Sequence, residues 1–434
     1  MYSETTDPNL KSFIEISEES HFPIQNLPYG VFNLNTLNQP HIGVAIGDLI
    51  LDLYVLNGEG LLNDFAEHEV FSKATLNDFM TLGKEKWSIA RKIISSLLRS
   101  DNPMLRDNTT LREKCFVNQK DVKMVLPVSI GDYTDFYSSK YHATNVGIMF
   151  RGKENALQPN WTHLPVGYHG RASSIVIDGY PVRRPKGQIF RKNDTEPVFT
   201  ACKRLDYELE MGFFVGPGNS IGEPITMEEA ENHIFGMVIV NDWSARDIQK
   251  WEYVPLGPFN AKNFLTSISP WIVTMEALEP FIIKGEKQDP EPLPYLQRKK
   301  DFTFDIKLEA YITTKIMKER HRITETNSSY LYWSIDQQLV HHAITGCNLR
   351  TGDLLASGTI SGPQPHERGC LLELSWDENK GSVPLNLPSN EQRTFLEDGD
   401  EIILTGWAQG GTYRIGFGEV SGKIVPAREE LRKS

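Results

Sequence analysis

Acidic and apolar side chains alternate along residues 204–215, and this stretch offers the first groups in the chain that could do chemistry. One face carries Asp206, Glu208 and Glu210, and the opposite face carries Leu205, Tyr207, Leu209, Met211 and Phe213. A period of two predicts a β-strand with an acidic face and an apolar face. Because residues two apart on a strand lie about 7 Å apart, Glu208 and Glu210 could hold one hard divalent cation together with oxygen ligands from other segments. A solvated face of an antiparallel strand is the alternative interpretation.

A second group of ionisable side chains lies in residues 131–147. Its tyrosines recur every four residues and predict a helical face that contains Tyr133, Tyr137 and Tyr141. Asp132 and Asp135 would lie in the first turn of this helix, where carboxylates suit the helix dipole, although capping accounts for only one of them. His142 follows Asp135 by seven residues and would lie on the same side of the helix. A general base and a structural histidine are both possible interpretations of His142.

Polar residues also follow the buried strand predicted for Ile234–Val240. Asp242 stands at the end of this strand, where its carboxylate would either cap the next helix or contribute an oxygen to a site. Arg246, Gln249 and Tyr253 share one face of that next helix. A face with this many hydrogen-bonding groups is unusual for a helix with a purely structural role.

Three further candidates stand apart from these groups. Lys262 and Thr266 lie in a predicted loop, and Glu373 stands among leucines in a strand predicted for Leu371–Trp376. A carboxylate buried in such a strand needs a partner. The loop Leu164–Arg171 is rich in aromatic and basic residues, a composition that suits a pocket for an acidic substrate.

Two other motifs in the chain indicate little chemistry. Residues 218–222 match the string G-x-S-x-G, but Pro224 follows and a helix start signal comes only at Thr226, so the strand-to-helix turn that a nucleophilic serine needs is missing. His341 and His342 are adjacent rather than four residues apart, which is a poor spacing for a pair of metal ligands on a helix. A packed or surface role suits these histidines better.

The elements around these residues predict two domains. Short strands are expected over Val31–Leu53, with a hairpin at Gly47-Asp48, and a helical period follows over Thr75–Ser100. We therefore predict a small β domain with appended helices at residues 1–125 and a larger domain at residues 126–434. The C-terminal segments are rich in predicted strands without an alternation of strands and helices, which indicates a mainly antiparallel architecture of the α+β class.

Length, charge and cysteine usage exclude several classes of protein. The chain has 434 residues and a formal net charge of −12, so a nucleic acid partner is not expected. No apolar run approaches the roughly 20 residues of a membrane span, and the N-terminus does not resemble a secretory signal. The cysteines are scattered without a Cys-x-x-Cys pair, at positions 115, 202, 347 and 370. This pattern suits a reducing compartment and predicts a cytoplasmic location.

Four of these stretches together resemble the eukaryotic, two-domain type of the fumarylacetoacetate hydrolase family. They are Gly131–Gly147 (GDYTDFYSSKYHATNVG), Asp206–Glu210 (DYELE), Asn241–Tyr253 (NDWSARDIQKWEY) and Leu354–Gly362 (LLASGTISG). The resemblance runs from about His21 to near the C-terminus. It implies a small N-terminal SH3-like β-barrel, a C-terminal β-roll domain and a homodimer. One departure is Leu265, which stands where the family has glycine, and about ten N-terminal residues have no counterpart.

The resemblance also implies roles for individual residues. Ca²⁺ or Mg²⁺ would be held at positions that match metal ligands of the family: Asp135, Glu208, Glu210, Asp242, Lys262 and Thr266. A protonated lysine has no lone pair for a metal, so Lys262 would act through its backbone or indirectly. The catalytic positions implied are His142 as general base, Glu373 as the group that orients it, and Arg246, Gln249 and Lys262 around an oxyanion. The substrate contacts implied are Tyr137, Arg151, Gln249, Tyr253 and Thr359, to which Tyr168 is a plausible addition.

The reaction implied is hydrolysis of a carbon–carbon bond in 4-fumarylacetoacetate, which yields fumarate and acetoacetate at the end of tyrosine and phenylalanine breakdown. A metal would chelate the diketone, and His142 with Glu373 would activate water. Two alternatives remain at this point. A metal-dependent decarboxylase or isomerase of small oxo acids would not need activated water, and a non-enzymatic metal scaffold would not need His142 with Glu373.

Overall fold

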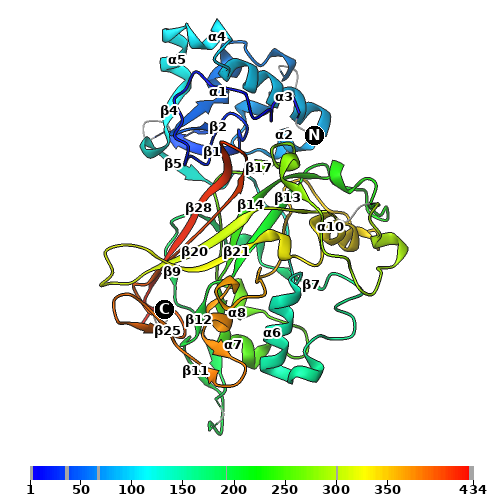
Figure 1. Ribbon diagram of the computed structural model, residues 1–434, viewed down its shortest axis with the longest axis vertical. Helices are drawn as coiled ribbons and strands as arrows, with labels where there is room; N and C mark the ends of the chain where they lie inside the picture. The colour runs from blue at the N-terminus through cyan, green and yellow to red at the C-terminus, as the bar shows by residue number, and fades with distance from the viewer. Residues whose placement is uncertain (1–2, 35–38, 66–68, 192, 300–301, 430–434) are drawn as a thin grey trace, which may run out of the picture.

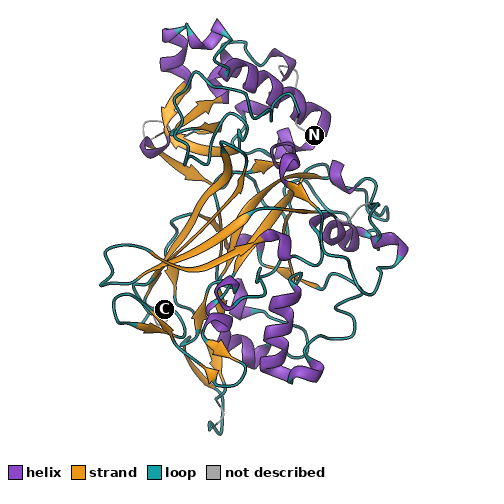
Figure 2. Ribbon diagram, in the orientation of Figure 1, coloured by secondary structure: helices purple, strands orange, loops and turns teal. Residues whose placement is uncertain are grey.

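The computed structural model describes residues 3–34, 39–65, 69–191, 193–299 and 302–429 of the protein. Strands dominate, and long strands run through the larger domain towards the smaller N-terminal domain (Figures 1 and 2). Most strand pairings are antiparallel, as the sequence predicts. The parallel pairings join β8 (Ile175–Ile177) to β16 (Thr266–Ile268), β6 (Tyr133–Phe136) to β22 (Leu354–Ala356) and β9 (Val182–Arg183) to β28 (Arg414–Val425). None of the helices within the described ranges combines the length and apolar character that a membrane span requires.

The N-terminal domain is built on an antiparallel sheet in the order β4-β3-β2-β1-β5. Its strands are β1 (Tyr29–Leu34), β2 (Pro40–Ile46), β3 (Leu49–Asp52), β4 (Phe116–Asn118) and β5 (Val122–Val125). The hairpin predicted at Gly47-Asp48 is confirmed, because Ile46 pairs with Leu49 and Gly47 has a φ of 55°. The helices are α1 (Leu53–Gly58), α2 (Asn77–Thr81), α3 (Lys84–Leu98), α4 (Pro103–Arg106) and α5 (Thr109–Cys115).

The helical segment predicted over Thr75–Ser100 is two helices rather than one. Gly83 has a φ of 83° and separates α2 from α3, since only glycine adopts this backbone conformation readily. The helical period of this segment predicts one apolar stripe, and α3 buries all of its members: Trp87, Ala90, Ile94 and Leu97. The polar sequence of residues 1–20 predicts a loosely held segment, but this is wrong at Thr5, which is buried and hydrogen-bonded to Arg91 and Glu276.

The larger domain contains a central sheet in the order β7-β6-β22-β13-β14-β16-β8, with β17 beside β14. The strands are β6 (Tyr133–Phe136), β7 (Gly167–Gly170), β8 (Ile175–Ile177), β13 (Leu209–Val215), β14 (Ile234–Asp242), β16 (Thr266–Ile268), β17 (Val273–Thr274) and β22 (Leu354–Ala356). A second sheet has the order β21-β20-β27-β28-β9, and its strands are β9 (Val182–Arg183), β20 (Lys307–Thr313), β21 (His321–Asn327), β27 (Glu401–Gln409) and β28 (Arg414–Val425).

Short ribbons and helices complete this domain. The ribbons pair β10 (Lys186–Ile189) with β11 (Val198–Ala201), β12 (Leu205–Asp206) with β15 (Ser244–Ala245), β18 (Ile282–Ile283) with β19 (Thr303–Phe304), β23 (Trp376–Asp377) with β24 (Gly381–Ser382), and β25 (Leu385–Asn386) with β26 (Gln392–Arg393). The helices are α6 (Lys140–Arg151), α7 (Arg246–Glu252), α8 (Asn260–Asn263), α9 (Met275–Leu278), α10 (Ile335–Ala343) and α11 (Leu371–Leu374). Helices α6, α7 and α8 gather at the end of the domain remote from the N-terminal domain (Figure 1).

The strand predicted for residues 204–215 is present but interrupted between β12 and β13. Its acidic face is not solvated, because β13 lies between β14 and β22 and all of its residues are buried. Glu208 and Glu210 therefore point into the protein interior, which removes the alternative of a solvated face.

The helix predicted for residues 131–147 is partly wrong. Tyr133–Phe136 forms strand β6, which pairs with β7 and β22, and the helix begins only at Lys140. The tyrosine spacing is thus a coincidence, and pairing with distant strands overrides it. Ser139 is the N-cap of α6, and its hydroxyl accepts from the His142 amide.

Two other local predictions are also corrected. Leu371–Leu374 forms the short helix α11 instead of a strand, which places Glu373 on a helical turn. The predicted capping contacts between Thr226 and Glu229 are present, but a three-residue 3₁₀ turn at Ala230–Asn232 replaces the expected helix.

The two domains share buried apolar contacts. Tyr29 of β1 exchanges two backbone hydrogen bonds with Ile272 of the larger domain. Phe235 of β14 packs edge-on against Trp87 of α3, with ring centroids 5.0 Å apart. The N-terminal domain therefore buttresses the base of β14, whose other end carries Asp242.

We predict that Gly147→Ala destabilises the protein, because a Cβ there would lie 1.8 Å from the carbonyl oxygen of Ala156. The loop after α6 would have to move, and thermal or denaturant unfolding should show a free energy of unfolding lowered by about 1–3 kcal/mol. Gly58→Ala is the control, because no atom lies within 4 Å of its added Cβ. Equal stability of both variants would contradict this view of how α6 is packed.

Candidate active site

Carboxylates from three strands of the central sheet converge in the larger domain. Asp135 comes from β6, Glu210 from the start of β13 and Asp242 from the end of β14, and Glu208 lies just before β13. Each offers an oxygen, and these oxygens lie within 4.8 Å of one another. All four side chains are buried, with relative exposures between 0 and 5%. Such a group of like charges in the interior requires compensation.

Lys262 supplies part of this compensation. Its ammonium contacts Glu208 and lies 2.5 Å from Asp242 Oδ2. Asp242 also accepts from Thr266 Oγ1 at 3.1 Å and from the Tyr168 hydroxyl at 3.2 Å. Asp242 is therefore a strand residue within the cluster and not the N-cap of the next helix, because Ala245 occupies the N-cap position of α7. Lys262 and Thr266 lie on α8 and β16, not in the predicted loop.

Two oxygens of the cluster lack a hydrogen-bond partner among the described residues: Asp135 Oδ1 and Glu210 Oε1. Burial, followed by the charge of Asp242, raises the pKa of Asp135 well above its ordinary value. Burial and the neighbouring charge of Asp135 likewise raise the pKa of Glu210. The orphaned oxygens and the all-oxygen donor set suit a hard divalent cation such as Ca²⁺ or Mg²⁺.

A buried histidine–carboxylate pair lies beside this cluster. His142 Nδ1 is 2.6 Å from Glu373 Oε2. Glu373 also accepts from Asn145 Nδ2 and Ser361 Oγ, each at 2.8 Å. Although burial raises the pKa of Glu373, the charge of His142 and these hydrogen bonds lower it to about 2. Glu373 is therefore an ionised group that holds the His142 ring in one orientation.

Cys370 completes the surroundings of Glu373. Its Sγ lies 3.2 Å from Glu373 Oε2, and the three residues His142, Cys370 and Glu373 lie close enough to be a second metal-ligand group. Burial and the charge of Glu373 raise the pKa of the Cys370 thiol well above its ordinary value. A protonated thiol donates to a carboxylate but is a poor metal ligand, so the arrangement suits a hydrogen-bonded pair.

Arg246 joins the carboxylate cluster to the neighbouring helix. Its Nη1 is 2.7 Å from Glu208 Oε1 and donates to Gln249 Oε1 at 3.3 Å. Its Nε donates to Asp206 Oδ2 at 2.9 Å. Within the described ranges, Arg246 Nη2 is buried without a hydrogen-bond partner, so it is a donor that an anion could accept from.

The remaining predicted substrate residues differ in their positions. Tyr137 packs edge-on against His142, with ring centroids 5.3 Å apart, and Thr359 is buried with a hydroxyl that has no partner in the described part of the chain. Arg151 donates to the carbonyl oxygens of Asn155 and Ala156. Burial and the charge of Glu373 raise the pKa of Tyr137, and the charge of Arg151 opposes this rise. Tyr253 is 39% exposed and packs against Phe150. The side chains of Arg151 and Tyr253 thus lie at the periphery.

The structure also reveals polar neighbours that sequence reasoning missed. Asn145 and Ser361 hold Glu373, and Asp206 holds Arg246. Asn145 follows His142 by one helical turn, a spacing that could have indicated it. Leu265 adopts no positive φ, since the described non-glycine residues with positive φ are Leu27, Glu69 and Asn390. Its difference from glycine therefore brings no backbone strain.

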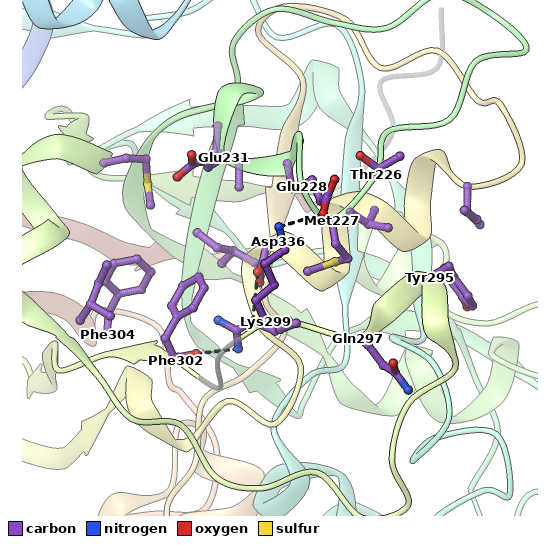
Figure 3. Close-up of a pocket in the computed structure, with 18 of the residues that line it drawn as sticks. Thr226, Met227, Glu228, Glu231, Tyr295, Gln297, Lys299, Phe302, Phe304 and Asp336 are labelled. Carbon is purple, nitrogen blue, oxygen red and sulfur yellow. Dashed lines mark hydrogen bonds and ion pairs between the residues drawn. The ribbon is translucent and has the colours of Figure 1, made fainter.

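The G-x-S-x-G string and the adjacent histidines His341 and His342 lie outside this site. Ser220 is exposed in a loop, His342 pairs with Thr134 at 2.8 Å, and His341 pairs with Tyr295 at 3.0 Å. A cavity of about 720 Å³ near the interdomain contact is also separate from the site (Figure 3). Its lining includes no predicted site residue, and the Lys299–Glu228 ion pair crosses one side of it.

Comparison with known proteins identifies similar chains. Residues 133–425 match the family described as fumarylacetoacetate hydrolase C-terminal, and residues 25–127 match the family described as fumarylacetoacetase N-terminal. The chain is 57% identical over 417 residues to the fumarylacetoacetase of Homo sapiens, which covers 96% of this chain and 99% of that protein. It is 52% identical over 420 residues to that of Arabidopsis thaliana, with coverage of 96% and 99%. A solved fumarylacetoacetate hydrolase from Exiguobacterium antarcticum has a TM-score of 0.51 at 17% identity, over 93% of this chain and 100% of that one, and shows the fold alone.

We predict that Ca²⁺ or Mg²⁺ stabilises the protein more at pH 8 than at pH 6. The pKa values of Asp135 and Glu210 are higher in the folded protein than in the unfolded chain. Protonation of these two carboxyls therefore stabilises the folded protein below about pH 4, and this stabilisation is lost as the pH rises through their raised pKa values. A cation binds the ionised carboxylates, so the increase in melting temperature on adding it should grow with pH.

The control variants separate this cluster from surface acids. Glu210→Gln should reduce the increase in melting temperature, whereas Glu228→Gln, which changes an exposed carboxylate paired with Lys299, should leave it unchanged. An increase that is the same at both pH values, or that survives in Glu210→Gln, would contradict the prediction.

Proposed function

The chain belongs to the fumarylacetoacetate hydrolase family, and we propose that it hydrolyses the carbon–carbon bond of 4-fumarylacetoacetate. The products are fumarate and acetoacetate, which places the reaction at the last step of tyrosine and phenylalanine catabolism. The observation that carries the mechanism is the buried His142–Glu373 pair at 2.6 Å beside a cluster of convergent carboxylates. An enzyme of the hydrolase class needs a group that activates water and groups that stabilise the resulting anion, and this site offers both.

The carboxylates of Asp135, Glu208, Glu210 and Asp242 would hold Ca²⁺ or Mg²⁺, together with Thr266. When bound, such an ion would polarise the diketone oxygens as a Lewis acid. Lys262 contributes charge to this group rather than a ligand atom, because the carboxylates of Asp242 and Glu208 raise its pKa and keep it protonated.

His142 acts as the general base in this proposal. Its Nδ1 carries the proton that it donates to Glu373 Oε2, which leaves Nε2 as the acceptor for a proton from water. The low pKa of Glu373 keeps that carboxylate ionised, so it stabilises the imidazolium as the water proton is transferred. The hydroxide formed attacks the carbonyl carbon to give a tetrahedral adduct. Collapse of this adduct breaks the carbon–carbon bond, and the acetoacetate carbon, which leaves as an enolate, takes up the proton held by His142.

Donors around the attacked carbonyl stabilise the negative charge of the tetrahedral adduct. Arg246 Nη2 is the clearest of these because it is buried and free of partners among the described residues. Gln249 and Lys262 lie beside Arg246 and complete the set. The remaining predicted substrate contacts would orient the substrate: Tyr137, Arg151, Tyr168, Tyr253 and Thr359.

A decarboxylase or isomerase of small oxo acids is the second candidate. It would use the carboxylate cluster but has no need of an oriented base for water. The dense hydrogen bonding around Glu373, with donors from Asn145, Ser361 and His142, favours hydrolysis because it serves to hold His142.

We also infer the finer architecture and location that the family implies. Residues 1–125 would be an SH3-like barrel with appended helices, supported by the antiparallel five-stranded sheet in which β1 to β4 are neighbours in sequence order and β5 pairs with β1. Residues 126–434 would be the β-roll domain. Cys115, Cys202, Cys347 and Cys370 are free, which supports a cytoplasmic location.

A homodimer is the assembly that we propose, with an exposed apolar surface at its interface. Val254, Leu256 and Phe259 are 66%, 94% and 62% exposed in the segment after α7. Neighbouring aromatic rings extend this surface, because Trp251 stacks on Phe190 at 4.8 Å. Contiguous exposed apolar side chains are typical of protein–protein contacts.

We predict that His142→Ala abolishes cleavage of fumarylacetoacetate, with kcat lowered by about 10²–10⁴-fold. Stabilisation by Ca²⁺ should persist, because His142 is no ligand in the proposed carboxylate site. In the wild-type reaction, labelled oxygen from water should appear in the new carboxylate of one product.

Glu373→Gln should lower kcat by about 10–100-fold, as expected of a group that orients the base.

His341→Ala is the matched control, because this histidine of α10 contacts Tyr295 and lies outside the site. Near-normal turnover in His142→Ala, or unlabelled products in labelled water, would replace hydrolysis by the decarboxylase or isomerase interpretation.

We predict that Leu256→Asp combined with Phe259→Asp shifts the protein from dimer to monomer in light scattering coupled to gel filtration. A charge at each of these positions would oppose burial in an interface. Ile316→Asp, at another apolar position with 64% exposure, should leave the dimer intact. A dimer that persists in the double variant would rule out this surface.

A further inference from the structure

We propose that Asp206 is a positioning residue that fixes Glu373 and Arg246 with a single carboxylate. This inference rests on the proposed function, because Asp206 would act on the reaction only through those two residues. Asp206 lies on β12, is fully buried and offers no oxygen to the carboxylate cluster. Neither the sequence patterns nor the family resemblance gives it a role.

In the described part of the chain, the Asp206 carboxylate accepts four hydrogen bonds, all from nitrogen donors. Its Oδ1 accepts from the amides of Leu371 at 2.8 Å and Tyr207 at 2.9 Å. Its Oδ2 accepts from Arg246 Nε at 2.9 Å and from the amide of Leu372 at 3.0 Å. The carboxylate thus joins β12 to the start of α11 and to the start of α7.

Helix α11 depends on this contact. It has four residues, and Cys370 at its N-cap makes no side-chain capping hydrogen bond. The first amides of a helix lack intrahelical partners, and a single turn is marginal without tertiary support. Asp206 satisfies the first two amides and places negative charge at the positive end of the helix. Glu373 stands on the next residue, so its position follows from that of the helix start.

Arg246 depends on the same carboxylate in a different way. Asp206 holds Nε at 2.9 Å, while Glu208 holds Nη1 at 2.7 Å. Because the guanidinium group is planar, these two anchors fix the direction of Nη2, the donor without a partner in the described chain. Loss of the Asp206 anchor would leave the guanidinium free to turn about its remaining contacts.

The test is Asp206→Asn, which preserves the size of the side chain. The amide group must point a donor at Arg246 Nε and Leu372 or at Leu371 and Tyr207, so at least two hydrogen bonds are lost whichever way it is turned. We expect kcat to fall by about 10–100-fold, with KM changed less than about threefold. The increase in melting temperature on adding Ca²⁺ should be retained.

Asp400→Asn is the matched control. Asp400 is also buried, also binds an arginine in two places (Arg393 Nε at 2.8 Å and Nη2 at 3.0 Å), and also accepts from a backbone amide, that of Glu397. Its loss should lower stability without changing kcat. If the two variants lose kcat equally, or if Asp206→Asn keeps wild-type kcat, the positioning role is wrong.

The double variant Asp206→Asn/Glu373→Gln tests the route of action. If Asp206 acts partly through Glu373, its loss should slow the Glu373→Gln enzyme by less than it slows the wild type. Fully multiplicative effects would contradict that route.

A crystal structure of Asp206→Asn separates this inference from the proposed reaction. We expect Glu373 and the Arg246 guanidinium to be displaced relative to the wild type, and unchanged positions of both would overturn the inference whatever the reaction is. Failure of the wild-type enzyme to cleave fumarylacetoacetate would instead count against the proposed function, and the displacement would still decide the role of Asp206.

Discussion

The rest of the site depends on the burial of negative charge. Asp135, Glu208, Glu210 and Asp242 place four carboxylates within one small region of the interior, where water cannot screen their repulsion. Lys262 contacts two of them, and Arg246 contacts one. These two cations cannot balance the set, because Arg246 also pairs with Asp206. The uneven balance is visible in the raised pKa values of Asp135 and Glu210 and in the depressed pKa of Glu208, beside both cations.

The fold maintains this unfavourable arrangement by building it on the central sheet. Strands β6, β13 and β14 and the residue just before β13 carry the carboxylates, and the base of β14 packs against the N-terminal domain through Phe235 and Trp87. Backbone groups also contribute, since the amide of Gly358 donates to Glu210 Oε2 at 3.1 Å. The proposed catalytic groups outside the sheet lie on α6, α7 and α11, and Asp206 of the ribbon strand β12 forms hydrogen bonds with the start of both α7 and α11. A rigid charged centre with anchored helices around it is a favourable arrangement for electrostatic catalysis.

Some of this could be predicted from the sequence and some could not. The alternation around Glu208 and Glu210 predicts their strand, and the run at Ile234–Val240 predicts the strand that ends at Asp242, because both signals are local. The burial of the acidic face is not a local property, since it depends on β13 lying inside the sheet. The sequence pattern around Asp135 predicts a helix, whereas the structure has strand β6. The partners of this strand, β7 and β22, are distant in the sequence and leave no local signal.

The His142–Glu373 pair illustrates the same limit. The two residues are 231 positions apart, and no spacing rule joins them, so only the family resemblance could suggest the pair. The helix that carries Glu373 also could not be predicted from the sequence, because its first amides donate to Asp206 and not to a residue nearby in the chain. The most direct measurement of the central claim is a crystal structure grown with Mn²⁺ and examined by anomalous scattering. We expect one anomalous peak, with oxygens of Asp135, Glu208, Glu210 and Asp242 at about 2.0–2.6 Å from it. A peak elsewhere, or a cluster whose carboxylates point away from any ion, would contradict it.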